Sequence, residues 1–217
     1  MLTGASRGIG AAIAEELRAL SINVMTPGRD ELDLSSPASV DRYLENFSGE
    51  GVDILINNAG LNIPKVIGEV SMENFSQIMQ VNLASAFRLI QFFAPKMAQR
   101  GYGRILNISS ILGTVAKEGR AVYSMSKSAL DALTRAVALE YGPRGVLANS
   151  LAPGYVDTEL THKNNTPEQI AELLGSIPLR RMAAPVELAK IAGFLVSVEN
   201  SYLTGQTILV DGGFTCL

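Results

Sequence analysis

Tyr123 and Lys127 are two residues whose types and spacing indicate proton-transfer chemistry. They stand four apart in a stretch of helical periodicity, so they share one helix face, about one turn or roughly 6 Å of rise apart. A phenol with a pKa of about 10 transfers protons poorly at neutral pH, and a neighbouring ammonium lowers that pKa by stabilising the phenolate. Taken alone, the same spacing also describes a surface tyrosine packed on a lysine stem.

A serine precedes this pair by thirteen residues. Ser110 follows the apolar run that ends at Ile108. A hydroxyl at the end of such a strand could steady the oxygen of a carbonyl group. Together with Tyr123, it suggests a site that binds and protonates a carbonyl oxygen.

The opening segment, Thr3–Gly10, reads Thr-Gly-Ala-Ser-Arg-Gly-Ile-Gly and leads directly into a helical stretch. Glycines at such a turn let the backbone approach a pyrophosphate, which the free amides and the helix dipole then favour. The spacing is Gly-x-x-x-Gly-x-Gly, whereas the more familiar one is Gly-x-Gly-x-x-Gly. The segment therefore suggests a nucleotide site, with a tight strand-to-helix turn as the simpler alternative.

The residues after the second apolar run bear on which dinucleotide would bind. A site for NAD usually places a carboxylate there to hold the ribose hydroxyls, but this run ends in Thr26-Pro27-Gly28 and is followed by Arg29. Arg7, within the glycine turn, is a second cation nearby. Because guanidinium groups form paired hydrogen bonds to phosphate oxygens, the two arginines favour the 2′-phosphate of NADP(H), with NAD(H) left open.

The elements that must position these residues alternate along the chain. Short apolar, β-branched runs are separated by longer stretches of helical periodicity. The runs are Ile22–Thr26, Val52–Ile56, Ile105–Ile108, Val146–Leu151 and Thr207–Val210, and the helical stretches are Ile9–Leu20, Ser36–Phe47, Met72–Arg100, Ala121–Tyr141 and Val186–Val198. This order predicts an α/β fold: a doubly wound, Rossmann-like parallel sheet with helices on both faces. No linker is visible, so residues 1–217 are expected to form a single domain.

Composition excludes several classes of protein. The 217 residues are 47% hydrophobic and 18% charged, which argues against disorder. A net charge of −3 provides no basic field for nucleic acid or an anionic membrane. One cysteine, Cys216, and one histidine, His162, argue against disulfides and metal clusters. Without an apolar run of roughly 20 residues or a signal pattern, we expect a soluble cytoplasmic protein that uses no metal.

Taken together, the motifs resemble the classical short-chain dehydrogenase/reductase family over essentially the whole chain. The residues that carry the resemblance are Thr3–Gly10, Asn57–Gly60, Asn82, Ser110, Tyr123 with Lys127, and Pro153-Gly154 with Thr158. The closing segments, Tyr202–Gln206 and Val210–Gly213, look like the branch that contains 3-oxoacyl-[acyl-carrier-protein] reductases and sugar-alcohol dehydrogenases.

The resemblance implies an NADP(H)-dependent oxidoreductase that reduces a small-molecule ketone to a secondary alcohol, or runs the reverse reaction. Tyr123 would protonate the carbonyl oxygen, Lys127 would lower the pKa of Tyr123 and bind the nicotinamide ribose, and Ser110 would hydrogen-bond the substrate oxygen. Asn82 would hold a water that links Lys127 to solvent. An NAD(H)-dependent sugar or polyol dehydrogenase remains an alternative, and a non-catalytic dinucleotide sensor is a weaker one.

The same resemblance assigns the cofactor to the glycine turn, an adenine pocket, the end of a strand, and the segment around Pro153. Besides Tyr123 and Lys127, the residues expected to bind it are Gly4, Ser6, Arg7, Gly8, Ile9, Gly10, Arg29, Asp33, Leu34, Asn57, Ala59, Gly60, Pro153, Gly154, Val156 and Thr158. Family members are mostly tetramers, so a homotetramer that pairs the helices Met72–Arg100 and Ala121–Tyr141 is expected. Residues 155–177 read as an inserted substrate lid.

Two features depart from the family pattern. Only Met1 and Leu2 precede the glycine turn, so either the first strand is unusually short or the natural chain begins upstream. Between Arg29 and Ser36 the chain is too short for a crossover helix, which would leave the adenine more exposed.

Overall fold

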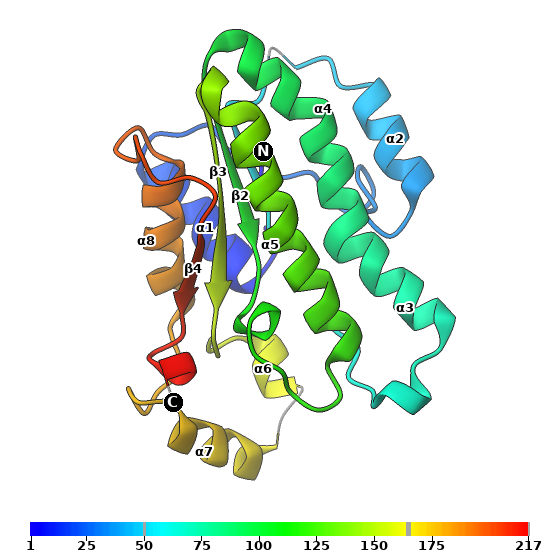
Figure 1. The fold of residues 1–217 in the computed structure, drawn as a ribbon, viewed down its shortest axis with the longest axis vertical. Coiled ribbons are helices and arrows are strands. Elements are labelled where there is room, and N and C mark those ends of the chain that lie inside the picture. Colours follow the sequence, from blue (N-terminus) through cyan, green and yellow to red (C-terminus); the bar gives the residue numbers. More distant parts are fainter. Residues whose placement is uncertain (50, 164–165, 217) are drawn as a thin grey trace.

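A parallel sheet lies at the centre of the computed structural model, which describes residues 1–49, 51–163 and 166–216 (Figure 1). Its strands pair in the order in which they occur in the sequence. They are β1 (Ile54–Asn57), β2 (Gly103–Ile108), β3 (Val146–Pro153) and β4 (Thr207–Val210). Every residue of β2 is buried and so is nearly all of β3. This continuous burial is what a sheet covered on both faces requires.

Eight α-helices connect and cover these strands within the described residues. They are α1 (Gly8–Ala19), α2 (Pro37–Glu45), α3 (Met72–Met79), α4 (Ser85–Arg100), α5 (Ala121–Tyr141), α6 (Glu159–Lys163), α7 (Pro167–Ser176) and α8 (Pro185–Val196). In α2, the side chain of Ser36 caps the first turn by accepting from the Ser39 amide, and Pro37 follows it.

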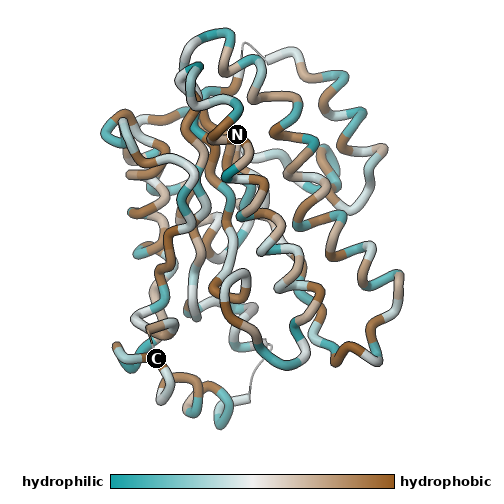
Figure 2. Tube along the Cα trace, viewed as in Figure 1, coloured by the Kyte–Doolittle hydropathy of each residue, from teal (hydrophilic) through white to brown (hydrophobic). Residues whose placement is uncertain are grey.

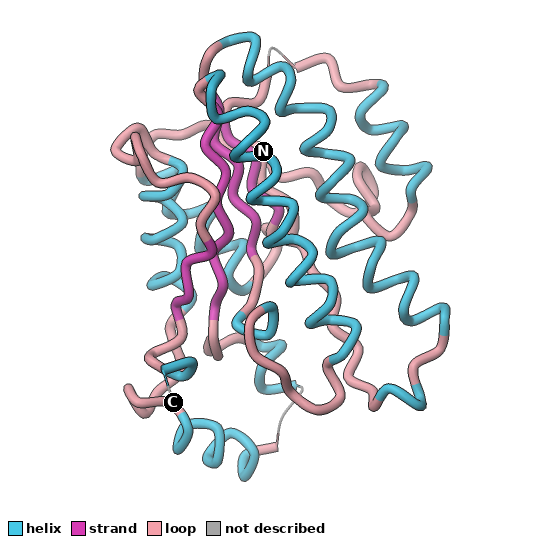
Figure 3. Tube along the Cα trace, in the orientation of Figure 1, coloured by secondary structure: helices cyan, strands magenta, loops and turns pink. Residues whose placement is uncertain are grey.

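The helices form one layer on each face of the sheet (Figure 3). On one face α2, α4 and α5 bury apolar residues against the strands, and on the other α1 packs against α8. Along most helices hydrophobic and hydrophilic residues alternate with each turn (Figure 2), as expected where only one side meets the sheet. The predicted α/β class, a Rossmann-like parallel sheet with helices on both faces, is confirmed.

The prediction of a strand at Ile22–Thr26 is wrong. This segment is not a strand, although the Met25 carbonyl accepts a hydrogen bond from the Leu2 amide at 2.9 Å. On the other side, Leu2 forms an isolated parallel bridge with Ile56 of β1. Met1 and Leu2 alone lie between the two segments, too short a stretch for a ladder that would include 22–26. The Met1 amino group donates to the Ile54 carbonyl at 2.7 Å, and burial lowers its pKa to about 6.

The predicted helix Met72–Arg100 is interrupted. Between α3 and α4 the chain forms a turn of π-helix over Gln80–Ala84, in which the Ser85 amide donates to the Gln80 carbonyl five residues back. Asn82, in the middle of this turn, directs its buried side chain to the backbone of Leu61 and does not pack along the helix. Single π-helical turns often occur at functional sites, so this interruption is relevant to the cleft described below.

The segment predicted as a lid contains α6 and α7, which lie beyond the carboxyl ends of the strands (Figure 1). Asn164 and Asn165, within it, lie outside the described residues. A helix long and apolar enough to cross a membrane is absent from the described part of the chain.

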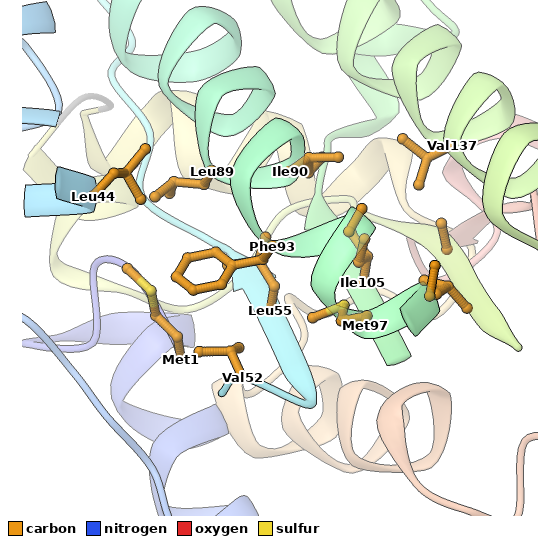
Figure 4. Packing of buried hydrophobic residues seen from close by; sticks show 14 of the residues in the cluster. Met1, Leu44, Val52, Leu55, Leu89, Ile90, Phe93, Met97, Ile105 and Val137 are labelled. Atoms are coloured by element: carbon orange, nitrogen blue, oxygen red, sulfur yellow. The ribbon is translucent and has the colours of Figure 1, made fainter. Parts of the chain in front are cut away.

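Phe93 of α4 is the largest side chain fully buried in the core on the α4–α5 face (Figure 4). Its ring meets Phe47 edge to face at 5.1 Å between centroids and meets Phe92 at 5.0 Å.

Replacing Phe93 with alanine removes this packing and leaves a cavity, so we expect the free energy of unfolding to fall by about 3–5 kcal/mol. Urea denaturation measures the change. Met72→Ala, at a largely exposed residue, is the control and should change it by less than about 0.5 kcal/mol. Equal losses in the two variants would contradict this core.

Candidate active site

A cleft of about 450 Å³ opens at the carboxyl ends of the strands, where ligands bind in open parallel sheets. The start of α1, the ends of β1 and β2, the first turns of α5 and the segment after β3 line it. Most of the residues predicted from the sequence share this cleft. They are Gly4, Ser6, Arg7, Gly8, Ile9, Gly10, Ala59, Gly60, Ser110, Tyr123, Lys127, Pro153, Gly154, Val156 and Thr158.

Tyr123 and Lys127 enter the cleft from the same face of α5. Lys127 is 3% exposed, and its Nζ donates to the carbonyl of Ile108, at the end of β2, at 2.7 Å. That ammonium lies 5.6 Å from the centre of the Tyr123 ring. The end of the strand thus fixes the lysine next to the phenol.

The pKa values of the two groups shift in opposite directions. Burial lowers the pKa of Lys127 to about 8, an effect that the charge of Asp131 partly opposes. Burial raises the pKa of Tyr123 above its usual 10, while a hydrogen bond with Ser110 and the charge of Arg120 partly oppose the rise. As the pH increases, Lys127 therefore loses its proton before Tyr123 does. The expectation that Lys127 lowers the pKa of Tyr123 stays a prediction, and it applies to the pH range in which Lys127 carries its charge.

Ser110 lies beside the phenol at the end of β2. Its Oγ accepts from the Leu112 amide at 3.2 Å, which caps a short 3₁₀ turn at 111–113, and Ser110 lies close enough to Tyr123 to lower the pKa of the phenol. The two hydroxyl groups therefore converge, and a carbonyl oxygen placed between them could accept a hydrogen bond from each.

Asp131 continues the line one turn beyond Lys127 and was not predicted from the sequence. It is 5% exposed. Burial raises the pKa of its carboxyl group. Interactions with Ser150 and Ser109 and the charge of Lys127 partly oppose this rise. The spacing rule that pairs Tyr123 with Lys127 also pairs Lys127 with Asp131, so the signal was present in the sequence.

Asn82 does not line the cleft, and its side chain is bonded within the fold. Its Oδ1 accepts from the Leu61 amide at 2.7 Å, while Nδ2 donates to the Leu61 carbonyl at 2.9 Å and to Ser126 Oγ at 3.0 Å. A methyl group added at Gly60 would lie 3.6 Å from Lys127 Nζ and 3.7 Å from Asn82 Oδ1. Gly60 thus borders the space between the lysine and the asparagine. The water expected at Asn82 stays a prediction.

The glycine turn fits a bound diphosphate. Gly4 has a left-handed φ of +67°, and a Cβ on Gly10 would lie 2.1 Å from the Gly4 carbonyl oxygen, so neither position accepts a side chain. Asn58 Nδ2 secures the turn by donating to the carbonyls of Thr3 and Gly4 at 3.0 and 2.9 Å. No side chain caps the start of α1, whose N-cap is Arg7. Its first-turn amides and dipole are therefore available to an anion.

The two arginines predicted to hold a 2′-phosphate are both exposed. Arg7 lines the cleft and forms an ion pair with Glu159 of α6 at 3.7 Å. Arg29 lies outside the residues that line the described cleft and pairs with Asp33 at 3.5 Å. Exposed pairs of this kind contribute little stability, so either arginine could exchange its carboxylate for a phosphate.

Other predicted cofactor residues also lie outside the cleft lining. Hydrogen bonds from Ser35 to the Asp33 carboxylate lower the pKa of that carboxylate. The Leu34 carbonyl accepts from Gln80 Nε2 at 3.1 Å, and Asn57, buried in β1, donates to Asn107 Oδ1 at 2.8 Å. Within the described residues, no group of three or more His, Cys, Asp and Glu side chains could hold a metal ion.

The chain is similar to known proteins in both sequence and fold. The family model described as Enoyl-(Acyl carrier protein) reductase matches residues 30–215. The 3-oxoacyl-[acyl-carrier-protein] reductase of Vibrio cholerae is 36% identical over 233 aligned residues, which cover 98% of this chain and 95% of that protein.

Two solved structures share the fold over nearly their whole length. A Beutenbergia cavernae protein, described as an NAD(P)-dependent gluconate 5-dehydrogenase with bound NADP at low occupancy, has a TM-score of 0.95 and 35% identity. The alignment covers 100% of this chain and 96% of that one. A gluconate 5-dehydrogenase of Burkholderia cenocepacia, in complex with NADP and tartrate, has a TM-score of 0.90 and 29% identity, with 99% and 94% of the chains covered.

Replacing Asp131 with asparagine tests the charge interaction between Asp131 and Lys127 on α5. Because the carboxylate opposes the desolvation of Lys127, its removal should lower the pKa of Lys127 further below about 8. NMR titration of ¹³Cε-labelled lysine measures this pKa. Asp41→Asn, at a partly exposed carboxylate paired with Arg88, is the control and should leave it unchanged. An unaltered Lys127 titration in Asp131→Asn would show that the carboxylate has no such effect.

Proposed function

The chain belongs to the short-chain dehydrogenase/reductase family, and within it we propose an NADP(H)-dependent reductase that converts the ketone of a 3-oxoacyl thioester, or of a compound of similar shape, to a secondary alcohol. The observation that carries the proposal is the convergence of Ser110, Tyr123 and Lys127 in one cleft with the glycine turn. A dinucleotide sensor would not need these three side chains together.

Tyr123 is the proton donor in this proposal. Because burial keeps its pKa above 10, the phenol is protonated at neutral pH and can give its proton to the ketone oxygen. Ser110 holds that oxygen through its hydroxyl. When bound, the nicotinamide supplies the hydride that the substrate carbon receives. The reverse reaction requires Tyr123 to lose its proton first, because the phenolate then accepts the proton of the alcohol.

Lys127 acts on the product of that proton transfer. Below a pH of about 8 it carries a charge, which stabilises the phenolate left on Tyr123. Its bond to the Ile108 carbonyl holds it in place, and its remaining N–H groups can reach the nicotinamide ribose. We further propose that a water beside Asn82 and Gly60 returns the proton to Tyr123 through Lys127.

The cofactor proposed is NADP(H). Arg7 supports it because it lines the cleft beside the glycine turn and has only an exposed partner. The B. cavernae and B. cenocepacia proteins are both described with bound NADP.

A second candidate substrate class is a sugar acid or polyol, because both of these structural relatives are described as gluconate 5-dehydrogenases. A panel separates the readings by following NADPH oxidation with a 3-oxoacyl thioester, a keto sugar acid and a neutral ketose. A 2-enoyl thioester belongs in the panel because of the description of the matched family. Oxidation of NADPH by the enoyl thioester alone would contradict the proposal.

We also propose a homotetramer in the cytoplasm, with residues 155–177 as the substrate lid of a single domain. The tetramer is supported by exposed apolar side chains on the two helices expected to pair, Phe87 on α4 and Leu139 on α5. Sedimentation equilibrium should give about four times the 23.1 kDa of the chain. A monomeric mass at micromolar concentration would contradict it.

Tyr123→Phe should abolish turnover, by about 10²–10⁴-fold, while leaving NADPH binding intact, because only the proton donor is removed. Lys127→Ala should be comparably inactive. Stopped-flow NADPH oxidation measures turnover and cofactor fluorescence measures binding. Ser124→Ala is the matched control on the same helical turn. The Ser124 hydroxyl is buried without a hydrogen-bond partner, so its removal should be nearly silent. Wild-type turnover in Tyr123→Phe would refute the assignment.

Arg7→Gln combined with Arg29→Gln tests the choice of cofactor. Loss of the guanidinium groups should raise the KM for NADPH about tenfold or more, since bonds to a charged phosphate are lost, and should leave the KM for NADH nearly unchanged. Steady-state kinetics with both cofactors measure the ratio. Arg42→Gln, on α2, is a control that removes one guanidinium group from a residue outside the described cleft. Equal effects on NADPH and NADH would contradict recognition of the 2′-phosphate.

A further inference from the structure

Two basic side chains that the proposed mechanism leaves without a binding role line the same cleft. Lys117 and Arg120 belong to the loop that leads into α5. Lys117 Nζ donates to Tyr155 Oη at 3.3 Å and lies 5.3 Å from the centre of that ring. The Tyr155 ring packs edge to face on Phe214 at 5.5 Å, so the lysine rests on a wall built from the segments after β3 and β4.

Arg120 lies directly before the first residue of α5, and three residues before the proton donor. Its guanidinium is half-buried, and burial lowers its pKa, an effect that nearby Tyr155 and Tyr123 partly oppose. None of the ion pairs among the described residues involves Arg120 or Lys117. A partly desolvated guanidinium with five N–H donors and no acidic partner is suited to bind an anion that arrives with a ligand.

The position of these cations points to the substrate as the source of that anion. The cofactor diphosphate has its own site at the glycine turn and the start of α1, where Arg7 is the basic side chain. Arg120 and Lys117 instead interact with Tyr123 and Tyr155, next to the hydroxyl that meets the reacting carbonyl. Glu118, between them in the sequence, is exposed and is not among the residues that line the described cleft.

We propose that Lys117 and Arg120 form a subsite for a carboxylate of the substrate, so that the natural substrate is a small oxo acid. This inference rests on the proposed reductase function and, among its possible ketone substrates, favours an oxo acid over a 3-oxoacyl thioester. A planar guanidinium matches the two oxygens of a carboxylate, and Lys117 adds a point charge beside it. Both cations line the same cleft as Tyr123, so a carboxylate bound there would belong to the molecule whose ketone meets the phenol.

Arg120 also lowers the pKa of Tyr123, so its replacement has two separable consequences. A role limited to that electrostatic effect would change kcat and its pH dependence and leave substrate affinity unaltered. A carboxylate subsite changes affinity, and does so only for substrates that carry the charge. A matched pair of ligands, one charged and one neutral, therefore distinguishes the two roles.

The experiment measures binding of 3-oxobutanoate and of its methyl ester by calorimetry. The full-length chain is saturated with NADP⁺, so that no hydride is available and no turnover occurs. We expect the acid to bind about tenfold more tightly than the ester, as bonds to a charged group imply. Arg120→Gln should abolish that preference and Lys117→Met should reduce it. Arg144→Gln, which removes an exposed arginine just beyond the far end of α5, should leave it unchanged.

Undetectable binding of the acid, equal binding of acid and ester, or an unchanged preference in Arg120→Gln would each overturn the subsite. The failure of the subsite is distinguishable from that of the reductase function. Reduction of the neutral N-acetylcysteamine thioester of 3-oxobutanoate without any preference for the acid would leave the function standing and remove the subsite. Preferential binding of the acid without NADPH oxidation by any ketone would support the subsite and contradict the reductase function.

Discussion

The burial of ionisable groups on one face of α5 is the constraint on which the site depends. Tyr123, Lys127 and Asp131 follow one another at intervals of one turn on α5, which packs against β2 and β3. Desolvation acts on all three and favours the neutral form of each. The Ile108 carbonyl, at the end of β2, is the partner that holds the Lys127 ammonium in this buried position.

This burial also sets the chemistry available to the cleft. Since the phenol keeps its proton to a higher pH than the ammonium does, the resting site holds a proton donor and not a base. A charged cofactor or substrate that binds in the cleft changes the pKa values of both groups, because the interior screens charges weakly. The same reasoning applies to Arg120, whose cation faces two tyrosines and no carboxylate.

The features of the fold and the site that depend on residues close together in the sequence could be predicted from the sequence. The strand–helix alternation, the glycine turn and the Tyr123–Lys127 spacing depend on neighbours in the chain, and the structure brings the last two into one cleft. The π-helical turn was not predictable in this way, because Asn82 bonds to Leu61, twenty-one residues away. The expected strand at 22–26 depended on pairing with residues that Met1 and Leu2 do not provide. The direction of the Tyr123 shift required the depth of burial, which no spacing reveals.

The order in which Lys127 and Tyr123 titrate tests the central claim most directly. NMR titration of the unliganded protein with ¹³C-labelled lysine and tyrosine follows both groups, and Tyr123→Phe assigns the phenol signal. The account predicts that Lys127 titrates at about 8 and that Tyr123 stays protonated to a pH above 10. A Tyr123 that ionises first, or a Lys127 with the pKa of about 10.4 of an exposed lysine, would contradict it.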